Sequence, residues 1–392
     1  MEGVDLGQVQ VALRKFVAPE IVFGLGARSL AGQYARNLGA RRVLLVTDPG
    51  VVAAGWAGQV AESLAQAMLP TVLYSGVSPN PRDAEVAAGV ELYRSQGCDA
   101  LVAVGGGSPI DCAKGIGILA ANGGKILDFV GVDEVPLPMP PLLCVPTTGG
   151  TSADISQFAI IVDRAARAKE AIISKAVVPD VSLVDPATLT TMDPFLAACT
   201  AFDALVHAIE AFVSNASSPL TDVHALSAIR LVYRNLVRSL SAPQDLELRG
   251  QLMLGSLEAG LAFSNASLGA VHAMAHSLGG FCDLPHGECN ALLLDHVLAF
   301  NFSAAEERYE QISQAMGLDT RGLTRKEKLA AILSAVVRLR ADAGITATLE
   351  ARGVHRSDVR ELAAKAYKDP CSVTNPRPVR RRDLEVIYEE AL

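Results

Sequence analysis

The distribution of short apolar runs constrains the fold of this chain most strongly. Up to about residue 188, short runs rich in valine, isoleucine and leucine alternate with segments of helical composition. Runs such as VLLV at 43–46 and ALVAV at 100–104 have the length and composition of strands buried on both faces of a parallel sheet. The other expected strands are IVF at 21–23, TVLYS at 71–75, LLCV at 142–145 and VSLV at 181–184, with FAIIV and AIIS as edge strands or a hairpin.

The character of the sequence changes after Asp185-Pro186. Beyond this point the β-branched runs stop, and alanine- and leucine-rich segments such as LTDVHALSAIRLVYRNLVRSL continue to the end. The chain has 392 residues, half of them apolar, which is enough for two domains with separate cores. We therefore expect an α/β nucleotide-binding domain over residues 1–188 and an all-α domain over residues 189–392.

Charge and composition argue against several classes of protein. A net charge of −8 does not suit a nucleic-acid-binding surface, which needs basic side chains to contact phosphates. The N-terminal sequence MEGVDLGQVQ lacks the basic and apolar regions of a signal peptide, and we expect no apolar segment long enough to span a bilayer. The seven cysteines are scattered without paired spacing. These features predict a cytoplasmic protein with reduced thiols and neither nucleic-acid nor membrane partners.

The histidines predict a metal site. Three of the seven, His272, His276 and His286, lie within fifteen residues, and His207 lies one helical turn after Asp203 in AFDALVHAIEAF. Residues four apart share one face of a helix, so Asp203 and His207 can bind one ion together. Imidazole and carboxylate ligands suit Fe(II) or Zn(II). The pattern offers one histidine more than a four-ligand site needs.

Two glycine-rich turns are candidates for binding a pyrophosphate. The first, at 24–29, follows a strand and precedes Asp48 at about the distance of a ribose-binding acid, but its third glycine is replaced by Ser29. The second, at 105–108, leads directly into a helix whose N-terminal N–H groups can contact a phosphate. We favour the second turn. In either case Asp48 would repel a 2′-phosphate, which favours NAD over NADP.

Taken together and in order, these segments resemble the iron-containing (group III, metal-dependent) alcohol dehydrogenase family. The resemblance covers nearly the whole chain. It rests on VTDPG around Asp48, GGGSPIDCAK at 105–114, PTTGGTSAD at 146–154, FDALVHAIEAF at 202–212, GAVHAMAHSLGG with PHGECNALLL, and TNPRP at 374–378. It implies a dehydroquinate-synthase-like fold, in which an α/β domain and a helical domain enclose a cleft.

The resemblance also implies roles for individual residues. The metal ligands would be Asp203, His207, His272 and His286, and His276 would be a catalytic histidine that does not bind the ion. The cofactor would contact Asp48, Gly106, Gly107, Ser108, Asp111, Thr147, Thr148 and Lys169, and the substrate pocket would include Phe263 and Cys371. The glycine turn at 24–29 would then be structural.

The expected activity is NAD-linked interconversion of a small primary alcohol or diol and its aldehyde. A divalent ion, Fe(II) in first place and Zn(II) in second, would polarise the substrate oxygen while hydride moves between substrate and nicotinamide. The family resemblance further implies a homodimer or a larger homo-oligomer.

Three other functions are compatible with parts of the pattern. A zinc hydrolase with His-x3-His spacing requires a glutamate directly after the first histidine, where this chain has Ala273, so this function is disfavoured. A lyase of the dehydroquinate synthase type would use NAD and metal without accumulating NADH. A sensor would keep the site without turnover.

Overall fold

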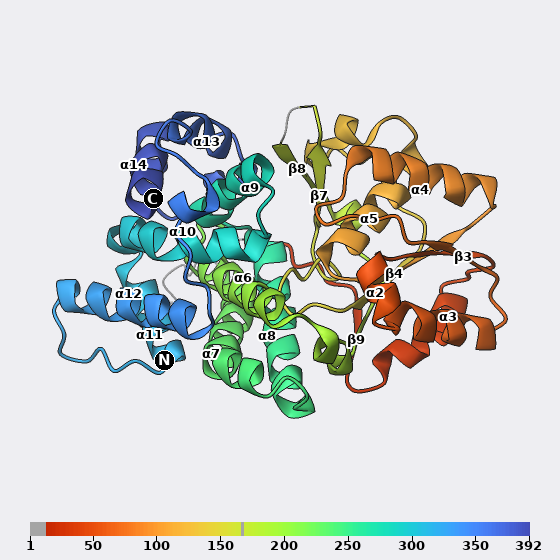
Figure 1. Ribbon diagram of the computed structural model, residues 1–392, viewed down its shortest axis with the longest axis horizontal. Coiled ribbons are helices and arrows are strands. Elements are labelled where there is room, and N and C mark those ends of the chain that lie inside the picture. Colours follow the sequence, from red (N-terminus) through yellow and green to blue (C-terminus); the bar gives the residue numbers. More distant parts are fainter. Residues whose placement is uncertain (1–12, 166–167) are drawn as a thin grey trace, which may run out of the picture.

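The computed structural model describes residues 13–165 and 168–392, so the segment on which the signal-peptide prediction rests lies outside the described residues. The molecule has two lobes that lie side by side (Figure 1). The lobe formed by the first part of the chain contains the strands, and the other lobe is helical.

The N-terminal lobe is built on a six-stranded parallel sheet with the order β1-β9-β6-β4-β2-β3. Its strands are β1 (Glu20–Phe23), β2 (Val43–Val46), β3 (Thr71–Tyr74), β4 (Ala100–Gly105), β6 (Leu142–Pro146) and β9 (Val181–Val184). Every residue of β2, β4, β6 and β9 is buried, as a parallel sheet covered on both faces requires. The strands predicted from the apolar runs are therefore confirmed.

Helices cover both faces of this sheet. The helical segments around the sheet are η1 (Ala27–Leu30), α1 (Ala31–Asn37), α2 (Pro49–Ala53), α3 (Trp56–Gln66), α4 (Asp83–Ser95) and α5 (Gly107–Asn122). Because side chains alternate along a strand, Leu45 packs with Val60 of α3 on one face, whereas Leu44 packs with Val86 of α4 and Ile116 of α5 on the other. The sheet is thus the middle of three layers, and its carboxyl ends face the helical lobe.

A small second sheet lies next to the helical lobe. It contains β5 (Gly131–Val132), β7 (Phe158–Asp163) and β8 (Ala168–Ile173), and β7 and β8 form the antiparallel hairpin that was one of the two predicted arrangements. Strand β5 was not predicted, because two residues carry no periodic signal. In Figure 1 the hairpin lies between α5 and α9. The segment η2 (Ile126–Phe129) lies between α5 and β5, and η3 (Lys175–Val177) lies between β8 and β9.

The helical lobe begins after η4 (Pro186–Thr191), which contains the predicted boundary at residue 188. Its long helices are α6 (Pro194–Val213), α7 (Pro219–Ser241), α8 (Leu246–Ala266), α9 (Ala270–Cys282), α10 (His286–Asn301), α11 (Glu306–Met316), α12 (Arg325–Asp342), α13 (Val359–Ala366) and α14 (Arg381–Ala391). Three short segments, η5 (Phe302–Ala304), η6 (Glu350–Arg352) and η7 (Pro370–Thr374), complete it.

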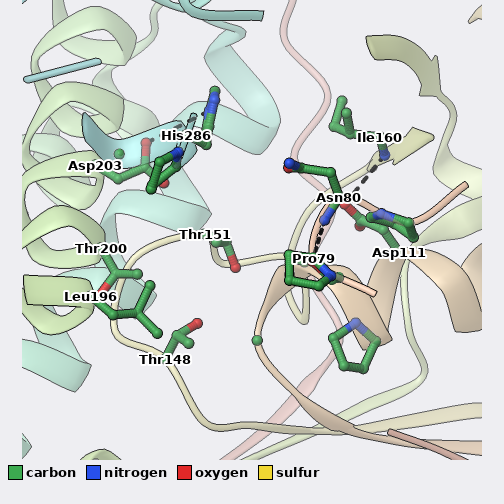
Figure 2. A pocket seen from close by; sticks show the side chains of 18 of the residues that line it. Pro79, Asn80, Asp111, Thr148, Thr151, Ile160, Leu196, Thr200, Asp203 and His286 are labelled. Carbon is green, nitrogen blue, oxygen red and sulfur yellow. Dashed lines mark hydrogen bonds and ion pairs between the residues drawn. The ribbon is translucent and has the colours of Figure 1, made fainter. Parts of the chain in front are cut away.

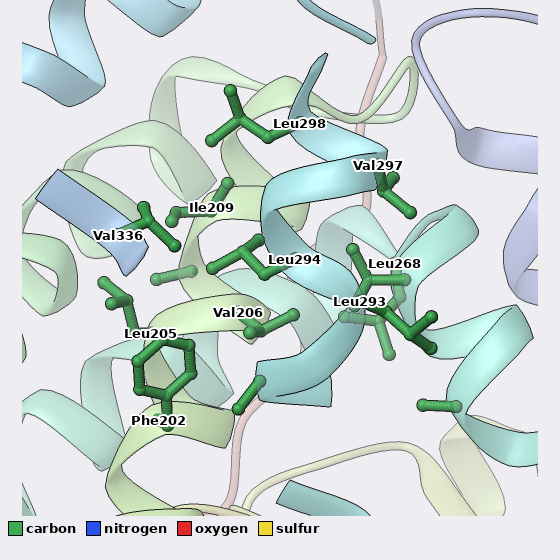
Figure 3. Close-up of a cluster of buried hydrophobic side chains, with 14 of the residues drawn as sticks. Phe202, Leu205, Val206, Ile209, Leu268, Leu293, Leu294, Val297, Leu298 and Val336 are labelled. Carbon is green, nitrogen blue, oxygen red and sulfur yellow. The ribbon is translucent and has the colours of Figure 1, made fainter. Parts of the chain in front are cut away.

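Helix α6 is the centre of this lobe. Figure 3 shows Phe202, Val206 and Ile209 of α6 among the apolar side chains of α10 and α12. By length and composition α6 could span a membrane, which contradicts the expectation that no segment would be long and apolar enough. However, 94% of its apolar window is buried inside the fold. A helix that is apolar all round is also what the interior of a large helical lobe requires.

Candidate metal and dinucleotide site

A cavity of about 1020 Å³ lies between the two lobes. It is lined from the N-terminal lobe by the loops after β2, β4 and β6, and from the helical lobe by residues of α6, α9 and α10. Figure 2 shows Asp203 and His286 on one side of the cavity and Asn80 and Asp111 on the other. Because parallel strands end at the same edge, the fold brings their carboxyl-terminal loops together here.

Four side chains converge on the helical side of this cavity. Asp203, His207, His272 and His286 each offer a ligand atom, and these atoms all lie within 4.8 Å of one another. The Oδ1 atom of Asp203 lies 3.9 Å from His207 Nε2, 3.6 Å from His272 Nε2 and 3.8 Å from His286 Nε2. Ligands 2.0–2.1 Å from a tetrahedral ion are about 3.4 Å apart. The three distances from Asp203 Oδ1 are thus slightly longer than those around a bound ion, and small inward movements of the side chains would be needed to bind one.

Local helix geometry explains this convergence. Asp203 and His207 are one turn apart on α6, as expected from their spacing. His272 lies in the first turn of α9, and His286 is the first residue of α10, directly after Pro285. Gly287 is needed beside His286, because a Cβ there would lie 2.1 Å from the carbonyl oxygen of Cys199 on α6. Close packing of α10 against α6 thus places His286 next to Asp203.

Hydrogen bonds fix which ring nitrogen faces the site. His272 Nδ1 lies 2.6 Å from Glu210 Oε2, and His207 Nδ1 lies 3.2 Å from the carbonyl oxygen of Gly150. Both acceptors hold the proton on Nδ1 and leave Nε2 free to bind an ion. Glu210 was missed in the sequence, because its contact with His272 joins residues that are 62 positions apart.

Asn290 is a second polar residue of the site that the sequence did not reveal. Its Nδ2 donates to Asp203 Oδ1 at 2.6 Å and lies 3.2 Å from the Nε2 atoms of both His272 and His286. The side chain is fully buried on α10. Asn290 therefore orients the carboxylate of Asp203 and lies close to two of the candidate imidazole ligands.

The electrostatics of the four side chains suit a divalent cation. Burial lowers the pKa of His207 to about 3 and the pKa of His286 well below its ordinary value, so both rings are neutral. Burial alone would raise the pKa of Asp203, but the surrounding histidines outweigh it and lower that pKa. For His272, burial is outweighed by Asp203 and Glu210, which raise its pKa to about 9. A buried excess of negative charge thus surrounds this ring, and a bound cation would neutralise it.

His276 lies beside the four ligands but outside their group. It lines the cavity, and its ring stacks on that of His286 with centroids 5.2 Å apart. Its Nδ1 lies 2.8 Å from Asp369 Oδ2, a contact that the sequence did not predict. The structure thus separates the fifth candidate from the other four, as the resemblance implied.

The N-terminal side of the cavity has the form of a phosphate cradle. Gly106 caps α5, and a Cβ at Gly106 or Gly107 would lie 2.8 Å from Thr148 or 3.1 Å from Thr151. Only glycine leaves these backbone N–H groups accessible to a ligand. Thr148 Oγ1 and Asp111 Oδ1 are buried without a hydrogen-bond partner, so both are available to a polar ligand. These features fit a dinucleotide.

The remaining predicted cofactor residues also line the cavity. Asp48 caps the short helix α2, where its Oδ1 accepts from Val51 N at 2.9 Å. Ser108, Thr147 and Lys169 lie on the cavity wall. Burial raises the pKa of Asp111 to about 6, against the lowering effect of nearby Lys114 and Lys169.

The other glycine turn has a structural role. The N–H of Gly26 donates to Asp185 Oδ2 at 2.9 Å, and Arg28 pairs with the same carboxylate. This turn therefore joins the end of β1 to the end of β9 and does not line the cavity.

The two residues expected in the substrate pocket have different positions. Phe263 lines the cavity and stacks on His207 with ring centroids 4.2 Å apart. Cys371 does not line the cavity, so its assignment to the pocket is corrected. Asp369 caps η7 through Cys371 N, and this turn directs Cys371 into the helical core, where it has no exposed surface.

Comparison with known proteins agrees with this geometry. Residues 18–186 match the family described as iron-containing alcohol dehydrogenase, and residues 197–392 match the C-terminal part of the Fe-containing alcohol dehydrogenase family. The 1,3-propanediol dehydrogenase of Citrobacter freundii is 38% identical over 379 residues, covering 96% of this chain and 98% of that protein. The NAD-dependent methanol dehydrogenase of Bacillus methanolicus is 36% identical, covering 96% and 99%. The lactaldehyde reductase of Escherichia coli is 35% identical, covering 94% and 97%.

Solved structures agree as well. The crystal structure of a 1,3-propanediol oxidoreductase superposes with a TM-score of 0.94 at 37% identity, covering 97% of this chain and 100% of that one. The chain therefore has the dehydroquinate-synthase-like fold and belongs to the iron-containing alcohol dehydrogenase family. It is a metal-dependent, NAD-linked oxidoreductase that interconverts alcohols and aldehydes.

Proposed function

We propose that this enzyme interconverts a small primary alcohol or diol and its aldehyde, with Fe(II) as the first candidate for the bound ion and Zn(II) as the second. The observation that carries the proposal is that one cavity contains both the four candidate metal ligands and the phosphate cradle at Gly106 and Gly107. The names of the relatives above refer to short alcohols or aldehydes, which supports a small substrate.

The proposed roles follow from the position of each side chain. Asp203, His207, His272 and His286 hold the ion. A bound ion would polarise the substrate oxygen, and a bound nicotinamide would exchange hydride with the substrate carbon. His276 accepts the alcohol proton at Nε2, because its Nδ1 is occupied by Asp369.

On the cofactor side, the proposed contacts come from the segments that follow β2, β4 and β6 and from strand β8. The cradle at Gly106, Gly107 and Ser108, with Asp111, receives the pyrophosphate, and Thr147, Thr148 and Lys169 contact the cofactor further along the cavity. Asp48 binds the adenosine ribose and disfavours a 2′-phosphate, so NAD is the preferred dinucleotide. Phe263 bounds the substrate end beside His207.

We also propose that the enzyme acts in the cytoplasm as a homodimer or a larger homo-oligomer, without nucleic-acid or membrane partners. Among the described residues, six cysteines form no disulfide, as in a reducing compartment; these are Cys98, Cys112, Cys144, Cys199, Cys289 and Cys371. The net charge of −8 disfavours association with nucleic acid.

The test is anaerobic purification and metal analysis, followed by reconstitution with Fe(II) or Zn(II). NADH formation is then measured with primary alcohols and diols of increasing length, and with secondary alcohols as controls. We expect one bound ion per chain and NADH accumulation with short primary alcohols. Substrate consumption without NADH accumulation would instead indicate a lyase, and an absence of turnover across the panel would indicate a sensor.

A further inference from the structure

Asp369 forms a buried contact with His276 that links two distant parts of the helical lobe. Asp369 precedes η7, and His276 is in the middle of α9, 93 residues earlier. The side chains are only 10% and 7% exposed, and Asp369 Oδ2 lies 2.8 Å from His276 Nδ1. Such a contact is shielded from water, so its geometry is well defined.

Both oxygens of this carboxylate have partners, so it cannot rotate freely. While Oδ2 faces His276, Oδ1 accepts from Cys371 N at 2.8 Å and thereby caps η7. The thiol sulfur of Cys371 lies within 4.8 Å of the carboxylate. Burial raises the pKa of Asp369, but His276 and Cys371 outweigh this effect and the net shift is downward. The group is therefore an ionised carboxylate.

An ionised carboxylate can only accept hydrogen bonds. His276 Nδ1 must therefore carry a proton, and a neutral His276 must have its lone pair on Nε2. The Nε2 atom is the one available to a ligand in the cavity that His276 lines. Without Asp369, the ring could adopt either tautomer and could rotate about its Cβ–Cγ bond.

We propose that Asp369 is a positioning residue that fixes His276 in the Nδ1–H tautomer, so that Nε2 accepts the proton of the alcohol. The proposal deepens the acid–base role proposed above for His276 and rests on it. In the reverse direction the same arrangement returns a proton from Nε2 to the oxygen of the reduced aldehyde, and Asp369 keeps its charge throughout. Asp369 itself touches neither substrate nor cofactor.

The Asp369→Asn variant tests this directly. An asparagine can keep the cap, because its Oδ1 can still accept from Cys371 N. Its NH₂ group would then face His276 Nδ1 as a donor, which places the proton of the neutral ring on Nε2. We expect kcat for alcohol oxidation to fall about 10²-fold, while the KM for the alcohol, metal content and NAD affinity stay unchanged.

The tautomer can be read separately from the activity. In the zinc-loaded full-length enzyme with ¹⁵N-labelled histidine, two-bond proton–nitrogen spectra distinguish Nδ1–H from Nε2–H rings, and His276→Gln assigns the signal. We expect Nδ1–H in the wild type and Nε2–H in Asp369→Asn. The matched control is Asp245→Asn, because Asp245 caps α8 through Glu247 N and Leu248 N without contacting a histidine. It should change neither kcat nor the His276 signal.

A double-mutant cycle separates positioning from a purely structural effect. If Asp369 acts through His276, the double variant Asp369→Asn/His276→Gln will be no slower than His276→Gln alone. Additive losses, or an unchanged tautomer in Asp369→Asn beside a slow His276→Gln, would refute the positioning role only. Full activity of His276→Gln would refute the acid–base role and the proposal with it.

An alternative role for Asp369 and His276 is to bind a metal ion. His276, Asp369 and Cys371 could together hold an ion, and Cys371 would then bind as a thiolate. Titration with Co(II) distinguishes the two cases, since the four-ligand site contains no sulfur. We expect no thiolate-to-cobalt absorption band with a second equivalent of Co(II). Appearance of that band, and its loss in Cys371→Ser, would overturn the proposal.

Discussion

Replacing Glu210 by glutamine is expected to weaken metal binding although Glu210 is not a ligand. Glu210 Oε2 accepts from His272 Nδ1 at 2.6 Å, and Oε1 accepts from Val271 N at 2.7 Å. In Glu210→Gln the side-chain oxygen can keep the bond to Val271 N. The amide NH₂ then faces His272 Nδ1, which favours a proton on Nε2, the ligand atom.

The expected loss of metal affinity can be estimated from the role of Glu210, which contacts the ring nitrogen of His272 that does not bind the ion. Loss of such a partner typically costs 10- to 100-fold in metal affinity, or about 1.4–2.7 kcal/mol. We expect the upper end here, because the buried contact is replaced by an unfavourable donor. A second effect arises at the start of α9, where Glu210 also accepts from backbone N–H groups. Removing a negative charge from a helix N-terminus costs about 0.3–2 kcal/mol of stability.

The assay is competition for Zn(II) between the purified enzyme and a chromophoric chelator, with unfolding measured separately in urea. Glu258→Gln is the matched control, because Glu258 Oε2 lies 2.5 Å from His224 Nδ1 in a pair that does not line the cavity. The control should leave the zinc Kd unchanged. An unchanged zinc Kd in Glu210→Gln as well would refute the argument that Glu210 controls the ligand atom of His272.

Three further predictions concern the ligands and the cofactor cradle. His272→Ala should lose both bound metal and activity while NAD still binds, as elemental analysis and calorimetry would show; full metal content would count against His272 as a ligand. Asp48→Gly should shift the NAD-to-NADP ratio of kcat/KM about tenfold toward NADP, because it removes a repulsion of about 1.4 kcal/mol between the carboxylate and the 2′-phosphate. An unchanged ratio would exclude Asp48 from cofactor selection. Gly106→Ala places a Cβ 2.8 Å from Thr148 and should raise the NAD Kd about tenfold or more, and equal affinity would mean that the cradle does not hold the dinucleotide.

The strands and long helices were predictable because their signals are local. Four-residue apolar runs and the change in composition after Asp185 are sufficient to locate the sheet and the helical lobe. The two-residue strand β5 is too short to have such a signal. Helix α6 shows the opposite problem, since its composition fits a membrane span and only its burial identifies it as a core helix.

The candidate ligands were predictable for the same reason, and their partners were not. Asp203 and His207 are four residues apart on one helix, whereas the contact from Glu210 to His272 spans 62 residues and that from Asp369 to His276 spans 93. An isolated glutamate or aspartate in a sequence gives no indication of such a contact. Cys371 was expected in the substrate pocket, but the cap formed by Asp369 turns its side chain into the core.

X-ray absorption spectroscopy of the zinc-reconstituted enzyme examines the proposed coordination most directly. Three imidazole nitrogens and at least one oxygen at about 2.0–2.1 Å, with no sulfur near 2.3 Å, are the expected first shell. A sulfur neighbour, or fewer than three imidazoles, would contradict the assignment of Asp203, His207, His272 and His286 as one metal site.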